Sequence, residues 1–71
     1  MQNQIPVVLR KDGESEYREL FKADVDDVLD FFDFIEDRGS IFLDDDTHDL
    51  SIHEVGFRSK ESQLIAEVVY L

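Results

Sequence analysis

The sequence predicts an α+β fold in which a single helix packs on one face of an antiparallel β-sheet, in the order ββαβββ. Residues 25–35 place apolar side chains at helical spacing. Short β-branched and aromatic runs stand on both sides of that segment, and a turn-forming Asp-Gly pair separates the first two of them. A chain of 71 residues has room for one domain, which we expect to span residues 1–71.

The N-terminal part is predicted to form a β-hairpin. Residues 5–9 are an apolar run broken only by Pro6, which suits the start of an edge strand because proline cannot donate to a sheet ladder. Asp12-Gly13 tolerates the positive φ that hairpin turns require. A second strand is predicted at residues 16–22, with a helix as the alternative, since Glu, Arg, Leu and Lys all favour helices.

The helix has a clear beginning and end. Asp24 is predicted to cap its N-terminus, and Gly39 to end it in a left-handed conformation. One buried stripe is expected to contain Val25, Val28, Leu29, Phe32 and Ile35. An arc of roughly 120° on the other side is acidic and contains Asp26, Asp27, Asp30, Asp33 and Asp37. Phe34 lies within that arc, where covering a small core does not require an aromatic side chain, so it is predicted to be a contact residue at an interface.

Three further strands are expected in the C-terminal half. Residues 41–43 form a short strand before an acidic turn at 44–48, and residues 50–57 form a longer one with Leu50, Ile52 and Glu54 on one face. Gly56 is expected to mark a bulge or bend, and residues 58–62 a polar turn. Residues 64–71 are apolar on both faces except for Glu67, which indicates a strand at the centre of the sheet or at a dimer contact.

The charge is concentrated in the middle of the chain. The formal net charge is −11, and residues 24–49 hold eleven acids and one arginine, a net −10. A chain that needs charge only for solubility spreads its acids over the whole surface. Such a segment disfavours binding to nucleic acid or to an anionic membrane and favours a basic protein as partner.

Other classes of function are not indicated. No cysteine is available for a disulfide or a thiolate zinc site, and no apolar run approaches the roughly 20 residues of a membrane helix. The N-terminus lacks the features of a signal peptide, so a cytoplasmic location is expected. No glycine-rich phosphate loop or catalytic triad is recognisable, so the protein is not expected to be an enzyme.

No metal or other cofactor is predicted either. Asp44 to Asp49 resembles the start of an EF-hand loop, but Asp49 and Val55 stand where that loop needs glycine and glutamate. His48 and His53 have no cysteine nearby and are expected to be ordinary turn and sheet-surface residues.

The acids are suited to imitate DNA. Duplex DNA carries one negative charge per roughly 1.7 Å of axis, and a helix of fourteen residues spans about 21 Å. The helix acids form one row of carboxylates, and a second row is expected alongside if the strand after Gly39 runs back. The predicted partner-binding residues are Asp26, Asp27, Asp30, Asp33, Phe34, Asp37, Asp44, Asp45, Asp46 and Asp49.

In these acids, which occupy about the middle third of the chain, the sequence resembles small acidic, phage-encoded DNA mimics. In size, lack of cysteine and strand–helix make-up it is most similar to the phage inhibitor of the histone-like nucleoid protein HU. That resemblance implies a homodimer that occupies the DNA-binding surface of HU in the bacterial host. One alternative is a small acidic adaptor or structural subunit that binds through its C-terminal strand and Phe34, and another is a metal-responsive protein.

Overall fold

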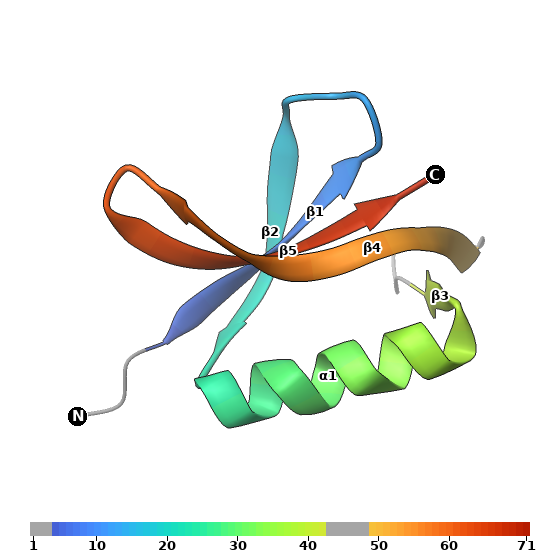
Figure 1. The fold of residues 1–71 in the computed structure, drawn as a ribbon, viewed down its shortest axis with the longest axis horizontal. Helices are drawn as coiled ribbons and strands as arrows, with labels where there is room; N and C mark the ends of the chain where they lie inside the picture. Colours follow the sequence, from blue (N-terminus) through green and yellow to red (C-terminus); the bar gives the residue numbers. More distant parts are fainter. Residues whose placement is uncertain (1–3, 43–48) are drawn as a thin grey trace.

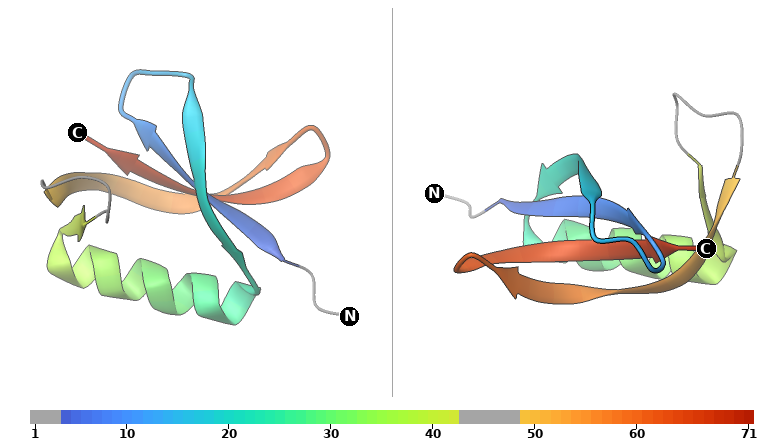
Figure 2. Two further views of the ribbon diagram at one scale, coloured as in Figure 1. Left: turned by 180° about the vertical axis from the view of Figure 1, so that it is seen from behind. Right: turned by 90° about the horizontal axis from the view of Figure 1, so that it is seen from above.

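The computed structural model describes residues 4–42 and 49–71. Its elements are β1 (Ile5–Lys11), β2 (Tyr17–Ala23), α1 (Val25–Arg38), β3 (Ser40–Phe42), β4 (Asp49–Lys60) and β5 (Gln63–Tyr70). The strands form one strongly twisted sheet in the order β2-β1-β5-β4-β3, and α1 lies along one face of it (Figures 1 and 2). The predicted α+β fold with the order ββαβββ is therefore confirmed, and so is the strand character of the segment before the helix.

The sheet is mixed, with one parallel pair among antiparallel ones. β1 runs parallel to β5, from Val7 beside Ala66 to Lys11 beside Tyr70, whereas the other neighbouring pairs are antiparallel. β1 is consequently an interior strand, and the edge position inferred from Pro6 is wrong. Pro6 is tolerated because the pairing with β5 begins only at Val7.

β5 is the central strand, which decides between the two interpretations of the C-terminal segment. It pairs with β1 on one side and β4 on the other, so both of its edges are used. Ala66 and Val68 pack in the core cluster beneath α1, while Ile65 and Val69 are buried on the opposite face. The apolar character of both faces therefore reflects a position in the middle of the sheet.

α1 covers the sheet with a narrower stripe than the spacing predicted. The core cluster consists of Ile5, Val7, Leu9, Val28, Phe32, Ile35, Ile41, Ala66 and Val68. Val25 and Leu29, which were expected in the stripe, are 47% and 46% exposed. They lie on the shoulder of the helix, beyond the arc that a single helix can press against a twisted sheet.

The helix ends and the first turn are formed as the residue types predicted. The Asp24 Oδ1 atom accepts a hydrogen bond from the Asp27 N–H at 3.1 Å. Gly39 adopts φ 79° and donates its N–H to the Ile35 carbonyl at 2.7 Å. Gly13, in the turn between β1 and β2, has φ 88°.

β4 differs from its prediction in length and in the position of its bulge. It continues to Lys60, and the turn that follows is only Glu61-Ser62, with φ values of 52° and 66°. The predicted turn at residues 58–62 was therefore too wide. Non-glycine residues rarely adopt such positive φ values, so neither residue type indicated a two-residue turn at this place. The bulge lies between Ile52 and Glu54, not at Gly56, and it turns Glu54 away from the face that Ile52 shares with Leu50.

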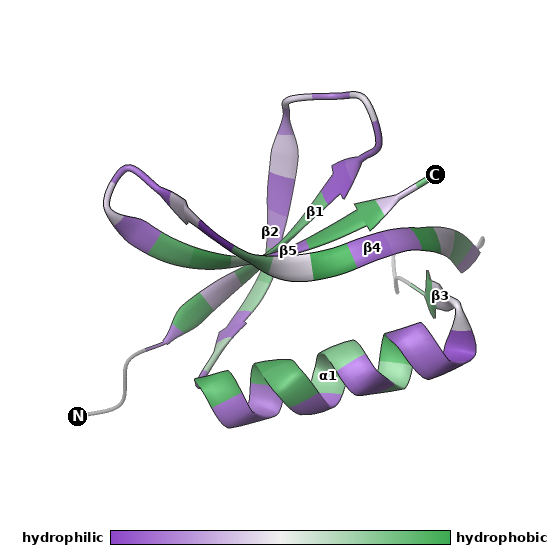
Figure 3. Cartoon of the chain, in the orientation of Figure 1, coloured by the Kyte–Doolittle hydropathy of each residue, from purple (hydrophilic) through white to green (hydrophobic). Residues whose placement is uncertain are grey.

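Hydropathy follows this architecture (Figure 3). Apolar residues dominate β5, the core strand, whereas α1 carries polar residues along the side turned away from the sheet. Within the described ranges, α1 is neither long enough nor apolar enough to cross a membrane.

Candidate acidic binding surface

The side of α1 turned away from the sheet, here called the acidic helix face, carries Asp26, Asp27, Asp30, Asp33 and Asp37, and all of these residues are exposed. Val28, Phe32 and Ile35 fix the helix on the sheet. Because the helical period is 3.6 residues, fixing this stripe turns the acids toward solvent. With Phe34, six of the ten predicted binding residues thus lie on one side of one helix.

The carboxylates of the acidic helix face are not neutralised within residues 4–42 and 49–71. The ion pairs found there use the acids Glu67, Asp49 and Glu54 instead. Like charges three or four residues apart destabilise a helix by roughly 0.2–0.5 kcal/mol per pair. The helix dipole favours Asp26 and Asp27, which lie in the first turn. The later acids, Asp30, Asp33 and Asp37, lack that compensation and therefore cost the helix stability.

Phe34 is an exposed aromatic residue among these acids. It is 62% exposed, as its position on the helix predicted. A shallow, open depression is lined by Asp30, Asp33, Phe34, Glu36 and Asp37. An aromatic face beside carboxylates is suited to a guanidinium or ammonium group, which can stack on the ring while pairing with the acids.

Asp49 belongs to a different environment from the five helix acids. It begins β4 beside the end of α1, where one Nη atom of Arg38 donates to both of its carboxylate oxygens at 3.1 Å. The Nε atom of Arg38 donates to Ser40 Oγ at 3.1 Å. Asp49 is therefore near the helix as expected, but its charge is shared with Arg38. Asp44, Asp45 and Asp46, the rest of the expected second row, lie outside the described residues.

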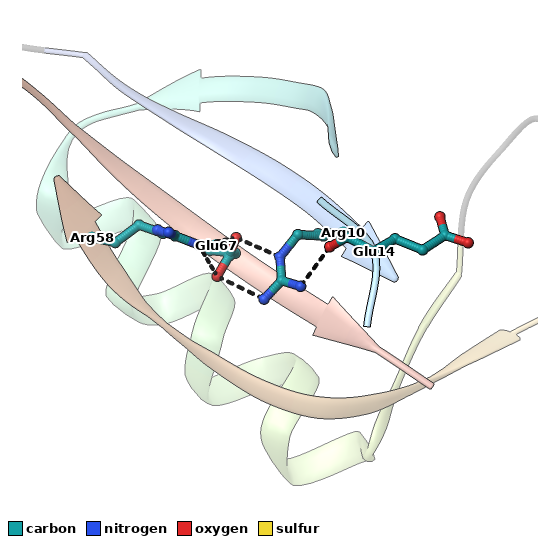
Figure 4. A network of polar contacts seen from close by, with 4 residues as sticks. All are labelled: Arg10, Glu14, Arg58 and Glu67. Carbon is teal, nitrogen blue, oxygen red and sulfur yellow. Dashed lines mark hydrogen bonds and ion pairs between the residues drawn. The ribbon is translucent and has the colours of Figure 1, made fainter. Parts of the chain in front are cut away.

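On the face of the sheet opposite α1, here called the far face, the carboxylate of Glu67 is paired with two arginines (Figure 4). Arg10 Nε donates to Glu67 Oε2 at 2.9 Å, and Arg58 Nη1 donates to the same oxygen at 3.1 Å. Arg10 also donates to the Glu14 backbone carbonyl at 2.8 Å. Burial raises the pKa of Glu67, but the hydrogen bonds and charges of the two arginines outweigh it and hold that pKa below its usual value.

Three bases of the flanking segments are thus used away from the helix. Arg10 and Arg58 hold Glu67, and the Lys60 ammonium lies 4.5 Å from the centre of the Tyr17 ring. This network was not predicted from the sequence. Its signal was Glu67 in an otherwise apolar central strand, because a buried carboxylate requires a cationic partner.

Two other candidate surfaces offer less. Val68 and Val69 are 0% and 3% exposed, so the exposed apolar side chains that the C-terminal segment offers for the adaptor role considered from the sequence are at its ends, at Leu64 and Leu71. The part of the chain that the structure describes contains no group of three or more His, Asp or Glu residues placed to hold a metal ion. His53 Nε2 lies 3.6 Å from Glu54 Oε1, and both side chains are exposed.

Comparisons with known proteins add no assignment. No protein-family model matches the chain, and neither a curated protein nor a solved structure matches it. A function for this chain is therefore inferred from its own residues.

Proposed function

We propose that the protein is a DNA mimic that binds the basic DNA-binding surface of a host protein and competes with DNA for it. The observation that carries the proposal is the acidic helix face, where five exposed carboxylates have no ion-pair partner within residues 4–42 and 49–71. Like charges on this face destabilise the helix, and an external cation that binds there removes this repulsion. Binding, not catalysis, is the role that such a surface supports.

The spacing of the charges is compatible with this role. Helix residues three and four apart are separated by about 4.5–6 Å along the axis, compared with about 3.4 Å per phosphate along one DNA strand. The charge density along the helix is thus within a factor of two of that of a single strand. The caps at Asp24 and Gly39 and the core contacts of Phe32 hold the row in place, which reduces the entropy lost on binding.

The partner that best fits is a bacterial nucleoid protein of the HU type, encountered in the cytoplasm of the host cell. Lysine and arginine side chains that normally hold phosphates would pair with the aspartates, and one of them would stack on Phe34. Direct binding to nucleic acid or to an anionic membrane is opposed by the net charge of −11.

The test is a gel-shift competition with purified HU and a labelled DNA duplex. The protein should release DNA from HU, and less effectively as salt concentration rises. The triple variant Asp30→Asn, Asp33→Asn, Asp37→Asn should compete at least tenfold less well.

A matched control removes three exposed acids elsewhere, by Glu16→Gln, Glu19→Gln and Glu61→Gln. It makes the same change in net charge away from α1 and should compete almost as well as the original protein. Equal losses in both triple variants, or full competition by the helix variant, would contradict a docking role for the acidic helix face.

A further inference from the structure

The strong twist of the sheet brings parts of its two hairpins together across the far face. Lys60, at the end of β4, pairs with Gln63 of β5, whereas Tyr17, at the start of β2, is level with Val69 near the other end of β5. In a flat sheet these two positions would lie about 14 Å apart across the strands and about 20 Å apart along them. The Lys60 ammonium nevertheless lies 4.5 Å from the centre of the Tyr17 ring. The far face is therefore concave in this region.

A pocket of about 330 Å³ lies in this concavity and is here called the far-face pocket. Three cationic side chains line it, those of Arg10, Arg58 and Lys60. Tyr17 and Ile65 add an aromatic and an aliphatic side chain to its lining. The pocket therefore combines positive charge with an apolar wall, and it lies on the opposite side of the sheet from α1.

The charges around the far-face pocket do not cancel. Glu67 also lines it and is the carboxylate that pairs with both arginines, so one negative charge stands against three positive ones. Glu14 lines the pocket as well, but it accepts from Arg10 through its backbone carbonyl. Its carboxylate points away from both arginines (Figure 4). Even with Glu14 counted, the pocket keeps an excess of positive charge in a chain whose net charge is −11.

Hydrogen-bond donors remain available at the pocket. The bonds that Arg58 makes within residues 4–42 and 49–71 all use its Nη1 atom, which donates to both Glu67 oxygens at 3.3 and 3.1 Å. A guanidinium has five N–H donors, and this side chain is 52% exposed. The Nε and Nη2 atoms of Arg58 can therefore bind a further acceptor, beside the Lys60 ammonium and the Ser15 hydroxyl. Several donors around one concave point are suited to an anion with several oxygens.

We propose that the far-face pocket binds the phosphate group of a small phosphate monoester. Arg58, Lys60 and Ser15 donate to the phosphate oxygens. Tyr17 and Ile65 contact the organic part of the ligand. Such a phosphate carries a charge of about −1.5 to −2 at pH 7, which matches the excess of positive charge. A long polyanion is not the ligand, since the net charge of −11 repels it beyond the pocket.

The first experiment titrates the protein with phenyl phosphate, inorganic phosphate and the neutral benzyl alcohol, followed by NMR chemical shifts of the backbone amides. Phenyl phosphate should bind with a dissociation constant of about 1 mM, which two or three charge-assisted hydrogen bonds supply. Inorganic phosphate should bind more weakly, because it makes no contact with Tyr17 and Ile65. Benzyl alcohol should not bind. The amides that shift should belong to β4, β5 and the turn between β1 and β2.

A matched pair of lysine variants locates the site. Lys60→Gln should weaken the binding of phenyl phosphate by about threefold, as expected for the loss of one exposed ion pair. The control Lys11→Gln makes the same charge change at an exposed position that neighbours Tyr70, on the helix side of the sheet. It should leave the dissociation constant almost unchanged. Since neither lysine contacts Glu67, both variants should keep the fold, which circular dichroism checks.

Glu67→Gln gives the opposite prediction. It removes the carboxylate that competes with the phosphate for Arg10 and Arg58, so phenyl phosphate should bind more tightly although the protein itself is less stable. Phenyl phosphate should then raise the unfolding temperature of this variant more than that of the original protein. The control Glu36→Gln makes the same charge change at an exposed position of α1 and should bind as the original protein does.

The inference would be overturned by a lack of binding of both phosphates, or by benzyl alcohol that binds as tightly as phenyl phosphate. Equal losses in Lys60→Gln and Lys11→Gln, or weaker binding by Glu67→Gln, would also overturn it. Equal affinity for the two phosphates would assign the pocket to free phosphate and reject a monoester. None of these measurements contains DNA or a target protein, so failed competition with DNA would leave their results untouched.

Discussion

The acidic helix face and the far face of the sheet carry charge in opposite ways. On the far face, one carboxylate, Glu67, is 12% exposed and is held by both Arg10 and Arg58. On the acidic helix face, five carboxylates stand in solvent without an ion-pair partner in the described part of the chain. The same chain thus neutralises a charge where burial makes this necessary and leaves charges unpaired where solvent surrounds them. Changes on the two faces should therefore have opposite effects on stability.

The largest effect is expected on the far face. Glu67→Gln removes the acceptor charge and leaves the two arginines, of which Arg10 is the less exposed, without a counter-charge. The free energy of unfolding should fall by about 2 kcal/mol, as measured by urea denaturation. The control Glu19→Gln changes an exposed carboxylate on β2 and should stay within about 0.5 kcal/mol. A loss no larger than that of the control would show that the network is an ordinary surface contact.

The pH dependence of that difference sharpens the comparison. The pKa of Glu67 is lowered in the folded protein, so its contribution to stability is complete above the unfolded pKa, near 4.5. The contribution is lost as pH falls through the folded pKa, because Glu67 then becomes protonated and the arginines lose their counter-charge. The difference in unfolding free energy between the original protein and Glu67→Gln should hold from pH 7 to about 5.5 and shrink below about 4.5. A difference that stays constant down to pH 3 would mean that packing, not charge, is responsible.

On the acidic helix face the sign reverses. The triple variant Asp30→Asn, Asp33→Asn, Asp37→Asn relieves several like-charge pairs at helical spacing. At roughly 0.2–0.5 kcal/mol per pair, the free energy of unfolding should rise by about 1 kcal/mol. Urea denaturation of the two proteins at low salt measures the change. A loss of stability would show that these aspartates make favourable contacts within the protein.

The elements of the fold that local chemistry determines were predictable from the sequence. Asp24 and Gly39 identified both ends of α1, and Asp12-Gly13 identified the first turn, because each position needs a particular residue type. The exposure of Phe34 followed from the period of the helix. The parallel pairing of β1 with β5 was not predictable, since it joins segments more than fifty residues apart and leaves no local pattern.

The errors share a physical origin in tertiary packing. Val25 and Leu29 fit the apolar period as well as Val28 does, and only the width of contact with a twisted sheet leaves them exposed. The turn at Glu61-Ser62 has no glycine, and the pairing of β4 with β5 imposes its positive φ values. For the candidate site, the sequence located the acids of the helix. That Arg10 and Arg58 would meet at Glu67, and so remain away from that helix, required the order of the strands.

The smallest effect is expected from added salt. The response to salt distinguishes repulsion between the acids of the helix from a general effect of the ions on stability. Helix residues three or four apart have Cβ atoms about 5–6 Å apart, whereas the Debye length falls from about 10 Å at 0.1 M to about 3 Å at 1 M salt. Screening of adjacent acids is therefore still incomplete at 0.1 M, and the unfolding temperature should continue to rise by a few degrees up to 1 M NaCl. The triple asparagine variant, scanned in parallel, should rise less, because it contains fewer of the pairs that salt screens. Equal slopes for the two proteins would assign the salt effect to the general action of the ions, and the acidic helix face would then carry no special strain.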